Sequence, residues 1–189
     1  MNQNTQTLKF RLASSHDIDF LLNLINHAYR SEHDNSWTNE AHLVEGERIG
    51  QSQLTSLIEL NQSNNSTSHL LIAESNEQQN SRVVGCVLIE YLKDDVEIGT
   101  YCIAADCQNL GYGKMVLGAA ETYALKFKPD VKHFVVWVLN QRHELIDYYQ
   151  RRGYSLTGLV QEYPYDAGVG TPLVELKLLE MKKTVVDHI

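Results

Sequence analysis

The sequence contains few cysteines, no long hydrophobic run and no excess of positive charge. Its three cysteines are an odd number without metal-ligand spacing, and a reducing cytoplasm is the simplest setting for them. No apolar stretch is long enough to span a bilayer, and residues 1–7 lack the basic and apolar parts of a signal peptide. We therefore expect a cytoplasmic protein that makes no membrane contact.

The charge balance narrows the choice of partners. A formal net charge of −8 argues against generic nucleic-acid binding, which needs a positive surface. The charge is compatible with an amine or cationic substrate, although most acidic soluble proteins have no such preference. The eight histidines are scattered and no pair suggests a zinc site, so we expect no metal.

Length and composition favour one domain over residues 1–189. The chain has 189 residues, of which 43% are hydrophobic and 21% charged, an ordinary balance for a chain with a sizeable core. Strands are expected at residues 8–12, 69–74, 83–92, 96–103, 133–139, 155–161 and 173–181, helices at 17–30, 51–60, 115–125 and 141–151, and a hairpin connection at 76–81. This alternation predicts an α/β (α+β) fold in which a mixed sheet is covered by helices.

The segment Gln108–Lys114, with the sequence QNLGYGK, lies between an expected strand and an expected helix. Gly111 and Gly113 allow a tight turn and a close approach of the backbone to a ligand. The first N–H groups of the helix have no partner within it, and the helix dipole is positive at that end. The segment therefore predicts a phosphate site.

Three phosphate-binding patterns compete for this segment. The P-loop pattern fails because Gln108 stands where glycine is required and Met115 where a hydroxyl is required. The dinucleotide pattern fails at Val116, where a third glycine is required. The pattern [Q/R]-x-x-G-x-[G/A] matches at every fixed position and resembles the pyrophosphate loop of the GNAT superfamily, the acyl-CoA-dependent N-acyltransferases. An ordinary strand–helix turn is the alternative reading of the same residues.

A second segment strengthens the resemblance. Asn140 follows the strand at 133–139, and a helical run then ends in Tyr149-x-x-x-Gly153-Tyr154, similar to the family's second signature. The resemblance covers about residues 8–182. It implies a GNAT fold with a mixed central sheet of about seven strands, flanked by about four helices. In that fold the strand before the loop and the strand after its helix splay apart to admit acetyl-CoA.

The resemblance also assigns residues to the cofactor. The backbone of Asn109–Lys114 would hold the pyrophosphate, N–H groups of Cys102–Ala104 the thioester carbonyl, and Asn140 the pantetheine arm, unless Asn140 only caps a helix. The residues assigned to the cofactor are Cys102, Ile103, Ala104, Gln108, Asn109, Leu110, Gly111, Tyr112, Gly113, Lys114 and Asn140. Gln108 departs from the arginine of many members, which predicts cofactor binding weaker by about 1 kcal/mol.

Two residues are assigned to catalysis. Tyr149 would donate a proton to the departing thiolate as general acid, or else serve as a packing aromatic. Its neighbour Tyr148 is expected in the core. Glu97 would act as general base through water, or else be an exposed strand residue. Cys102 near the thioester is expected to be a small apolar filler and not a nucleophile.

The acceptor side is assigned to two segments. The first, at residues 37–48, resembles a W-T-x-E-A-x-L-x-x-G-x-R block of a bacterial GNAT subgroup and supplies Trp37 and Glu40. The second supplies Glu162 and Tyr165. Acidic and aromatic side chains suit a small cationic amine.

The resemblance implies an N-acetyltransferase that moves acetyl from acetyl-CoA to a primary amine of a small molecule or peptide by direct attack. The alternatives are a non-catalytic acyl-CoA sensor on the same fold and a fold relative without a CoA site. The identity of the acceptor and the choice between monomer and homodimer stay open.

Overall fold

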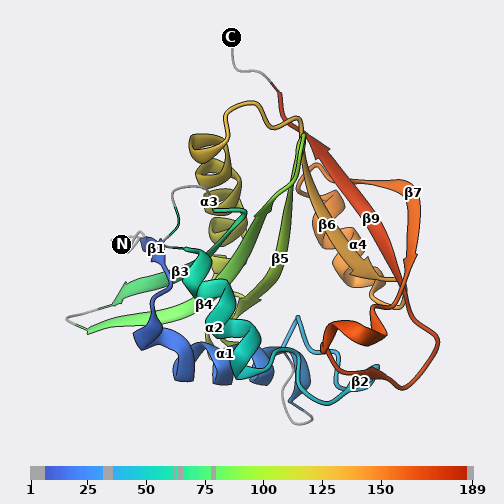
Figure 1. Cartoon of the computed structure of the whole chain (residues 1–189), viewed down its shortest axis with the longest axis horizontal. Coiled ribbons are helices and arrows are strands. Elements are labelled where there is room, and N and C mark those ends of the chain that lie inside the picture. The colour runs from blue at the N-terminus through green and yellow to red at the C-terminus, as the bar shows by residue number, and fades with distance from the viewer. Residues whose placement is uncertain (1–6, 32–35, 62, 64–65, 78–79, 187–189) are drawn as a thin grey trace, which may run out of the picture.

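Seven strands form one mixed sheet in the computed structural model, which describes residues 7–31, 36–61, 63, 66–77 and 80–186 (Figure 1). In spatial order they are β1 (Leu8–Leu12), β3 (Ser68–Glu77), β4 (Asn80–Tyr91), β5 (Asp95–Ile103), β6 (His133–Leu139), β9 (Lys177–Thr184) and β7 (Ser155–Glu162). Every neighbouring pair is antiparallel except β5 and β6. The mixed sheet predicted from the alternation of elements is confirmed.

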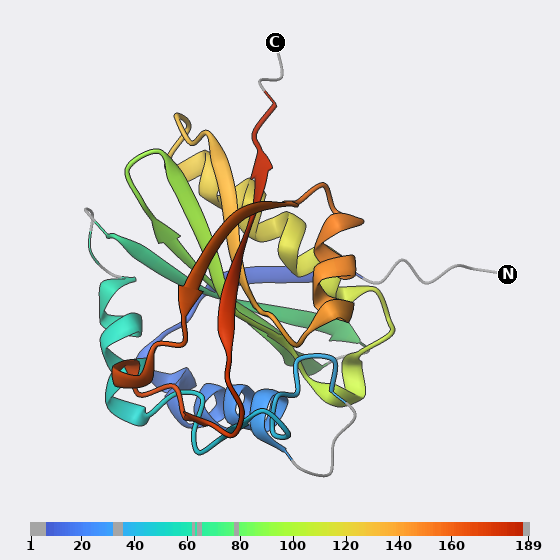
Figure 2. The same cartoon turned by 90° about the vertical axis from the view of Figure 1, so that its right-hand side faces the viewer.

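Two helices cover each face of the sheet (Figure 2). The helices α1 (Ile18–Arg30) and α2 (Gln51–Leu60) lie on one face, and α3 (Tyr112–Phe127) and α4 (His143–Gln150) on the other. In α1 the buried side chains of Leu21, Ile25 and Ala28 recur at helical spacing, which gives the helix one apolar stripe to place on the sheet. No helix in the described residues is long and apolar enough to cross a membrane.

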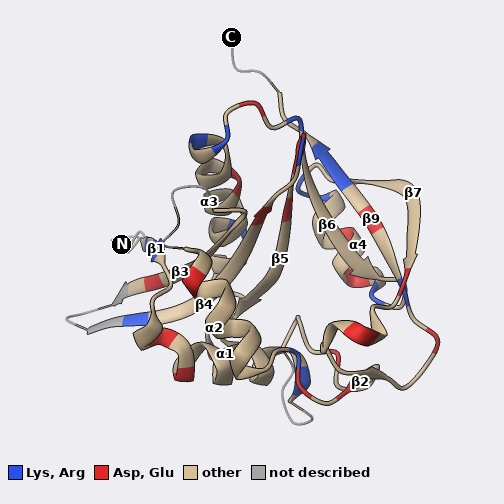
Figure 3. Ribbon diagram, in the orientation of Figure 1, with Lys and Arg blue, Asp and Glu red and all other residues tan. Residues whose placement is uncertain are grey.

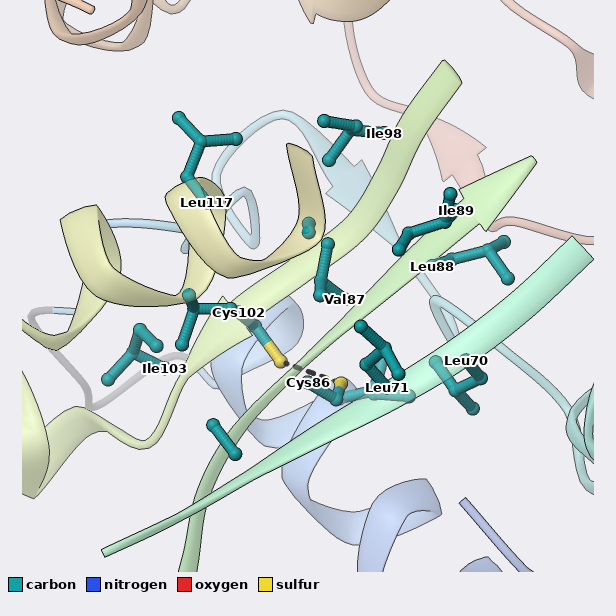
Figure 4. Packing of buried hydrophobic residues seen from close by; sticks show 14 of the residues in the cluster. Leu70, Leu71, Cys86, Val87, Leu88, Ile89, Ile98, Cys102, Ile103 and Leu117 are labelled. Atoms are coloured by element: carbon teal, nitrogen blue, oxygen red, sulfur yellow. Dashed lines mark hydrogen bonds between the residues drawn. The ribbon is translucent and has the colours of Figure 1, made fainter. Parts of the chain in front are cut away.

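The main core lies where β3, β4 and β5 pack between the helix layers. Side chains such as Leu71, Val87 and Ile98 are almost fully buried there (Figure 4). Cys86 of β4 and Cys102 of β5 stand opposite each other, with their sulfur atoms 3.6 Å apart. This half of the sheet is therefore a rigid platform for whatever lies at the far edge of β5.

The strands β5 and β6 are paired over only three residues each. Asp95–Glu97 pairs in parallel with His133–Val135, and beyond this point the strands diverge (Figure 1). The register of β5 on β4 also shifts between Cys86 and Leu88, where Thr100 has a positive φ of 40°. Such a bulge bends the strand. The splayed pair implied by the family resemblance is confirmed.

Four local expectations need correction. The hairpin connection expected at 76–81 is shorter, since β3 runs to Glu77 and β4 begins at Asn80. The helix expected from 141 begins at His143. The strand expected at 173–181 is β9, which begins only at Lys177 and ends at Thr184. A separate pair joins β2 (Val44–Glu45), in a segment expected to be irregular, with β8 (Thr171–Pro172), where no strand was expected. Both strands of that pair have two residues, too few for any periodicity to show.

Candidate active site

A cavity of about 850 Å³ fills the gap between the diverging strands β5 and β6. Its lining comes from both strands, from the loop before α3, from α4, and from the segment that follows α1. The lining includes Arg48, Glu97, Ile103, Gly113, Trp137, Tyr149 and Glu180. The topology thus brings the expected phosphate loop and the expected acceptor segment to one chamber.

The loop before α3 has the backbone of an anion site. Gly111 precedes the helix with a φ of 82°, a conformation that favours glycine. Met115 is the first residue of the helix whose N–H group donates to a backbone carbonyl, that of Gly111, at 3.4 Å. The N–H groups of Gly113 and Lys114 therefore have no acceptor among the described residues, and the positive end of the helix dipole lies beside the cavity.

Gly113 is held close to a pair of tyrosine hydroxyls. A Cβ atom at this position would lie 2.8 Å from Tyr101 Oη and 3.0 Å from Tyr148 Oη. The two hydroxyls are 2.6 Å apart and share a hydrogen bond, and the Arg152 guanidinium stacks on the Tyr148 ring at 3.3 Å. Glycine here lets the loop lie directly on the tyrosine pair.

The Gln108 amide makes protein contacts. Its Oε1 accepts from the Trp37 N–H at 2.8 Å, and its Nε2 donates to Ser36 Oγ at 2.9 Å and to the Ile103 carbonyl at 3.0 Å. Gln108 therefore ties the phosphate loop to the expected acceptor segment. These three bonds engage the hydrogen-bonding capacity that the resemblance reserves for phosphate.

The open edge of β5 narrows the choice of N–H groups that could hold the thioester carbonyl. Beyond Glu97, no strand among the described residues pairs with the edge that faces β6. The Ala104 N–H donates to the Val84 carbonyl on the β4 side at 2.8 Å, so it cannot hold a ligand. Because successive residues of a strand point to opposite edges, the Ile103 N–H faces the gap and that of Cys102 faces β4. The Cys102 sulfur lies in the core against Cys86.

Tyr148 and Tyr149 have exchanged their expected roles in packing. Tyr149 is the more deeply buried of the two, and Tyr148 is partly buried, so the expectation that Tyr148 is the core residue is wrong. Both line the cavity. The Tyr148 hydroxyl is bonded to Tyr101, whereas that of Tyr149 has no hydrogen-bond partner in the described part of the chain. Burial raises the pKa of Tyr149, so its hydroxyl stays protonated at neutral pH.

Glu97 lies in the gap and is partly buried. Trp137 Nε1 of β6 donates to Glu97 Oε2 at 3.2 Å. Burial raises the pKa of the Glu97 carboxyl, and repulsion by Glu90 and Glu180 adds to the rise, while the Trp137 bond opposes it. Acidic positions on β5 and β9 lie on the two sides of the gap (Figure 3), and Glu97 and Glu180 line the cavity. The reading of Glu97 as an exposed strand residue is therefore wrong.

The segment after α1 closes one side of the cavity. Trp37 packs on Tyr148, with ring centroids 6.0 Å apart, and also lines the cavity. Glu40 lines it too, but its carboxylate is paired with Arg30 at 3.0 Å and lies 3.8 Å from Arg142. Arg142 donates to the carbonyls of Trp37 and Asn39. The charge of the Glu40 carboxylate is thus balanced by arginine side chains of the protein itself.

Comparison with known proteins agrees with this geometry. The model of the acetyltransferase (GNAT) family matches residues 22–154, well over half of the chain. This chain belongs to the GNAT family of acetyltransferases. No curated protein sequence matches it.

Solved GNAT structures share the fold at low identity. The spermidine N-acetyltransferase of Vibrio cholerae, solved with CoA and spermine, has a TM-score of 0.67 and 17% identity and covers 94% of this chain and 95% of its own. The PaiA N-acetyltransferase of Thermoplasma acidophilum, solved with coenzyme A, has a TM-score of 0.64 and 18% identity, and the match covers 95% of this chain and 99% of its own. A GNAT acetyltransferase of Streptococcus pneumoniae has a TM-score of 0.64 and 17% identity, and the match covers 95% of this chain and 100% of its own.

Several residues expected at the site do not line the cavity of this GNAT chain. Asn140 is one of them: its Oδ1 accepts from the Lys177 N–H at 3.0 Å. The N-cap of α4 is Arg142, so the helix-cap role considered for Asn140 is wrong, and its contact with the pantetheine arm stays a prediction. Glu162 and Tyr165 are exposed outside the lining. Of the expected cofactor residues, Ala104, Leu110 and Tyr112 are also outside it.

Other lining residues have no assignment from the sequence pattern. Tyr29 of α1, Arg48 after β2 and Trp137 of β6 all face the cavity. Arg48 closes the W-T-x-E-A-x-L-x-x-G-x-R block, which is the one signal that points to it. Tyr29 and Trp137 look like ordinary apolar positions of a helix and a strand, so their place at the site depends on the tertiary fold.

Proposed function

We propose that this protein transfers acetyl from acetyl-CoA to a primary amine by direct attack. The observation that supports this most strongly is the unpaired edge of β5, which lines the same cavity as the loop before α3 and Tyr149. Solved relatives of the same fold hold CoA, and one is a spermidine N-acetyltransferase. A loop, an open strand edge and a proton donor in one chamber are what acyl transfer from a CoA thioester requires.

The residues present fit a CoA molecule. The free N–H groups of Gly113 and Lys114, with the Lys114 ammonium, suit a pyrophosphate. Gly113 lets the loop lie against the Tyr101 and Tyr148 hydroxyls, where a Cβ atom would clash. The Ile103 N–H, on the open edge of β5, would hold the thioester carbonyl oxygen and its developing negative charge. When bound, acetyl-CoA supplies an activated acyl thioester.

The chain's own side chains supply the two proton transfers. Glu97, whose pKa is raised by burial, accepts through water the proton that the attacking amine loses. Tyr149, which stays protonated at neutral pH, donates a proton to the departing sulfur. One C–N bond forms and one C–S bond breaks, and the proton lost by the amine is balanced by the one gained by the thiol.

Thiol release and product mass test the proposal together. Purified protein with acetyl-CoA and a panel of primary amines should release CoA thiol in proportion to an amine product heavier by one acetyl group. Calorimetry with CoA separates the alternatives. Binding without thiol release across the panel would indicate an acyl-CoA sensor, and no binding would indicate a fold relative without a CoA site.

A further inference from the structure

One cation on the acceptor side of the cavity lacks an anionic partner. Arg30 and Arg48 both line this side. The Arg30 guanidinium is buried and paired with Glu40 at 3.0 Å. Arg48 is partly buried and forms no ion pair in the described residues, and its guanidinium lies 5.2 Å from the centre of the Tyr29 ring. Burial raises the pKa of Glu90 and the charge of Arg48 opposes that rise, but no carboxylate of the described residues forms an ion pair with Arg48, so its guanidinium can take a ligand anion.

The Tyr29 ring connects Arg48 to the open strand edge. The Tyr29 hydroxyl donates to the Tyr101 carbonyl of β5 at 3.1 Å, next to the bulge at Thr100. Burial raises the pKa of Tyr29, and the charge of Arg48 opposes that rise. Arg48 is therefore separated by one tyrosine ring from the strand edge at which the acyl group is proposed to lie.

Carboxylates line the same chamber. Glu97 and Glu180 come from β5 and β9, on the two sides of the gap. Glu180 accepts from Thr157 Oγ1 at 2.7 Å and lies 3.5 Å from the Lys182 ammonium. The cavity thus holds a cation without an ion pair and, in Glu97, a carboxylate that suits an amine.

We infer that Arg48 binds a carboxylate of the acceptor, which is therefore a small molecule with both an amine and a carboxylate, as in a free amino acid. The inference rests on the proposed function and names its substrate class. The two groups must be only a few bonds apart, because one ring separates Arg48 from the strand edge. A guanidinium binds a carboxylate through two parallel hydrogen bonds, which also orients the amine.

This placement disfavours a substrate that carries only positive charge. A polyamine would bring an ammonium group near Arg48, where like charges repel. We assign Arg48 an anion other than the CoA phosphates, because α3, whose N-terminus is proposed to hold those phosphates, covers the face of the sheet opposite α1 (Figure 2).

Matched pairs of acceptors test the inference. Each pair is an amino acid and the amine that lacks only its α-carboxylate, such as phenylalanine with phenethylamine or lysine with cadaverine. We expect kcat/KM to be about 10- to 100-fold higher for the amino acid of a productive pair, the range for a hydrogen bond to a charged group. In Arg48→Gln this advantage disappears through a higher KM, and Arg48→Lys restores part of it. The kcat/KM of the amine that lacks the carboxylate changes by no more than about twofold in these variants.

Lys126→Gln is the matched control, since it removes one positive charge from the exposed end of α3 and should leave both rates unchanged. Wild-type protein that prefers the amine over its parent amino acid would overturn the inference, whether or not the variants fold. Equal loss for both members of a pair in Arg48→Gln would overturn it too. Calorimetry of amino acids with the CoA-loaded protein separates the two proposals. Binding that Arg48→Gln abolishes, without thiol release, contradicts only the proposed function, and no binding and no release contradict both.

Discussion

At the scale of single residues, the two adjacent tyrosines of α4 differ in what their hydroxyls contact. That of Tyr148 is bonded to Tyr101, whereas that of Tyr149 is unpartnered among the described residues and borders the cavity. Tyr149→Phe should therefore lower kcat by about 100-fold, the loss of a general acid. It should leave CoA affinity and the thermal midpoint unchanged, because no internal hydrogen bond is lost.

Tyr148→Phe is the control at the neighbouring position. It loses the 2.6 Å bond to Tyr101, so it should cost about 1 kcal/mol of stability with a smaller effect on kcat. Steady-state kinetics and thermal unfolding of both variants give the comparison. A wild-type kcat in Tyr149→Phe would remove Tyr149 from the proton-donor role.

Glu97 should govern the acidic limb of the pH–rate profile. A general base acts only when deprotonated, and burial raises the pKa of Glu97 above its ordinary 4.5. The value of kcat/KM should therefore rise with pH through this raised pKa, and Glu97→Gln should abolish the limb. Glu90→Gln removes a repulsive charge, so the limb should move to lower pH. A limb that neither substitution alters would assign the base to another group.

At the scale of elements, the start of α3 is set by its contact with β5 and α4. Gly113→Ala would place a Cβ atom 2.8 Å from Tyr101 Oη and 3.0 Å from Tyr148 Oη. Since both rings are fixed by packing, the loop must shift. We expect CoA affinity to fall by about 10-fold or more, because the loop amides lose their alignment.

Gly118→Ala on the same helix is the matched control. A Cβ atom at Gly118 meets no atom within 4 Å, so this variant should bind CoA normally and gain about 0.5–1 kcal/mol from helix propensity. Calorimetry with CoA reads out both variants. Equal affinities in the two would show that the contact between the loop and the tyrosine pair does not matter for binding.

At the scale of the whole molecule, the two parts of the sheet meet over three residue pairs and are tied again across the open end by Arg142. Arg142 is buried, and its removal leaves the Trp37 and Asn39 carbonyls without their donor. Arg142→Met should destabilise the fold by on the order of 3 kcal/mol and raise the KM of the acceptor.

Glu144→Gln serves as its control, because that carboxylate is half exposed and its pair with Arg142 should contribute less than about 1 kcal/mol. Denaturant unfolding measures both variants. Similar stabilities for Arg142→Met and Glu144→Gln would contradict the role of Arg142 as a tie across the gap.

The sequence predicts most of the sheet and the glycine-bearing turn before α3 because these depend on local signals. The apolar run at His133–Leu139 marks a strand buried on both faces, and the glycines at 111 and 113 mark the turn. The role of Tyr149 comes from the family resemblance, through its spacing to Gly153, and stays a prediction. These features are set by residues close in the chain, so they can be read without the fold.

The acceptor side depends on contacts between distant residues. The start of α4 is fixed by Arg142, whose guanidinium bonds to carbonyls about a hundred positions earlier, so spacing misplaces the cap at Asn140. Arg48 is held from α1, since its backbone N–H donates to Asn26 Oδ1 at 2.7 Å and its guanidinium lies 5.2 Å from the centre of the Tyr29 ring. Glu162 is acidic in the right segment but points to solvent, because strand alternation places its neighbours Gln161 and Tyr163 in the cavity.

The central claim is that CoA and an amine meet in the gap between β5 and β6. A crystal structure of the protein soaked with CoA and an amino acid tests it most directly. We predict the pyrophosphate on the N–H groups of Gly111–Lys114, the thiol near Tyr149 and the amino acid carboxylate on Arg48. CoA bound elsewhere on the surface, with the gap filled by side chains, would contradict it.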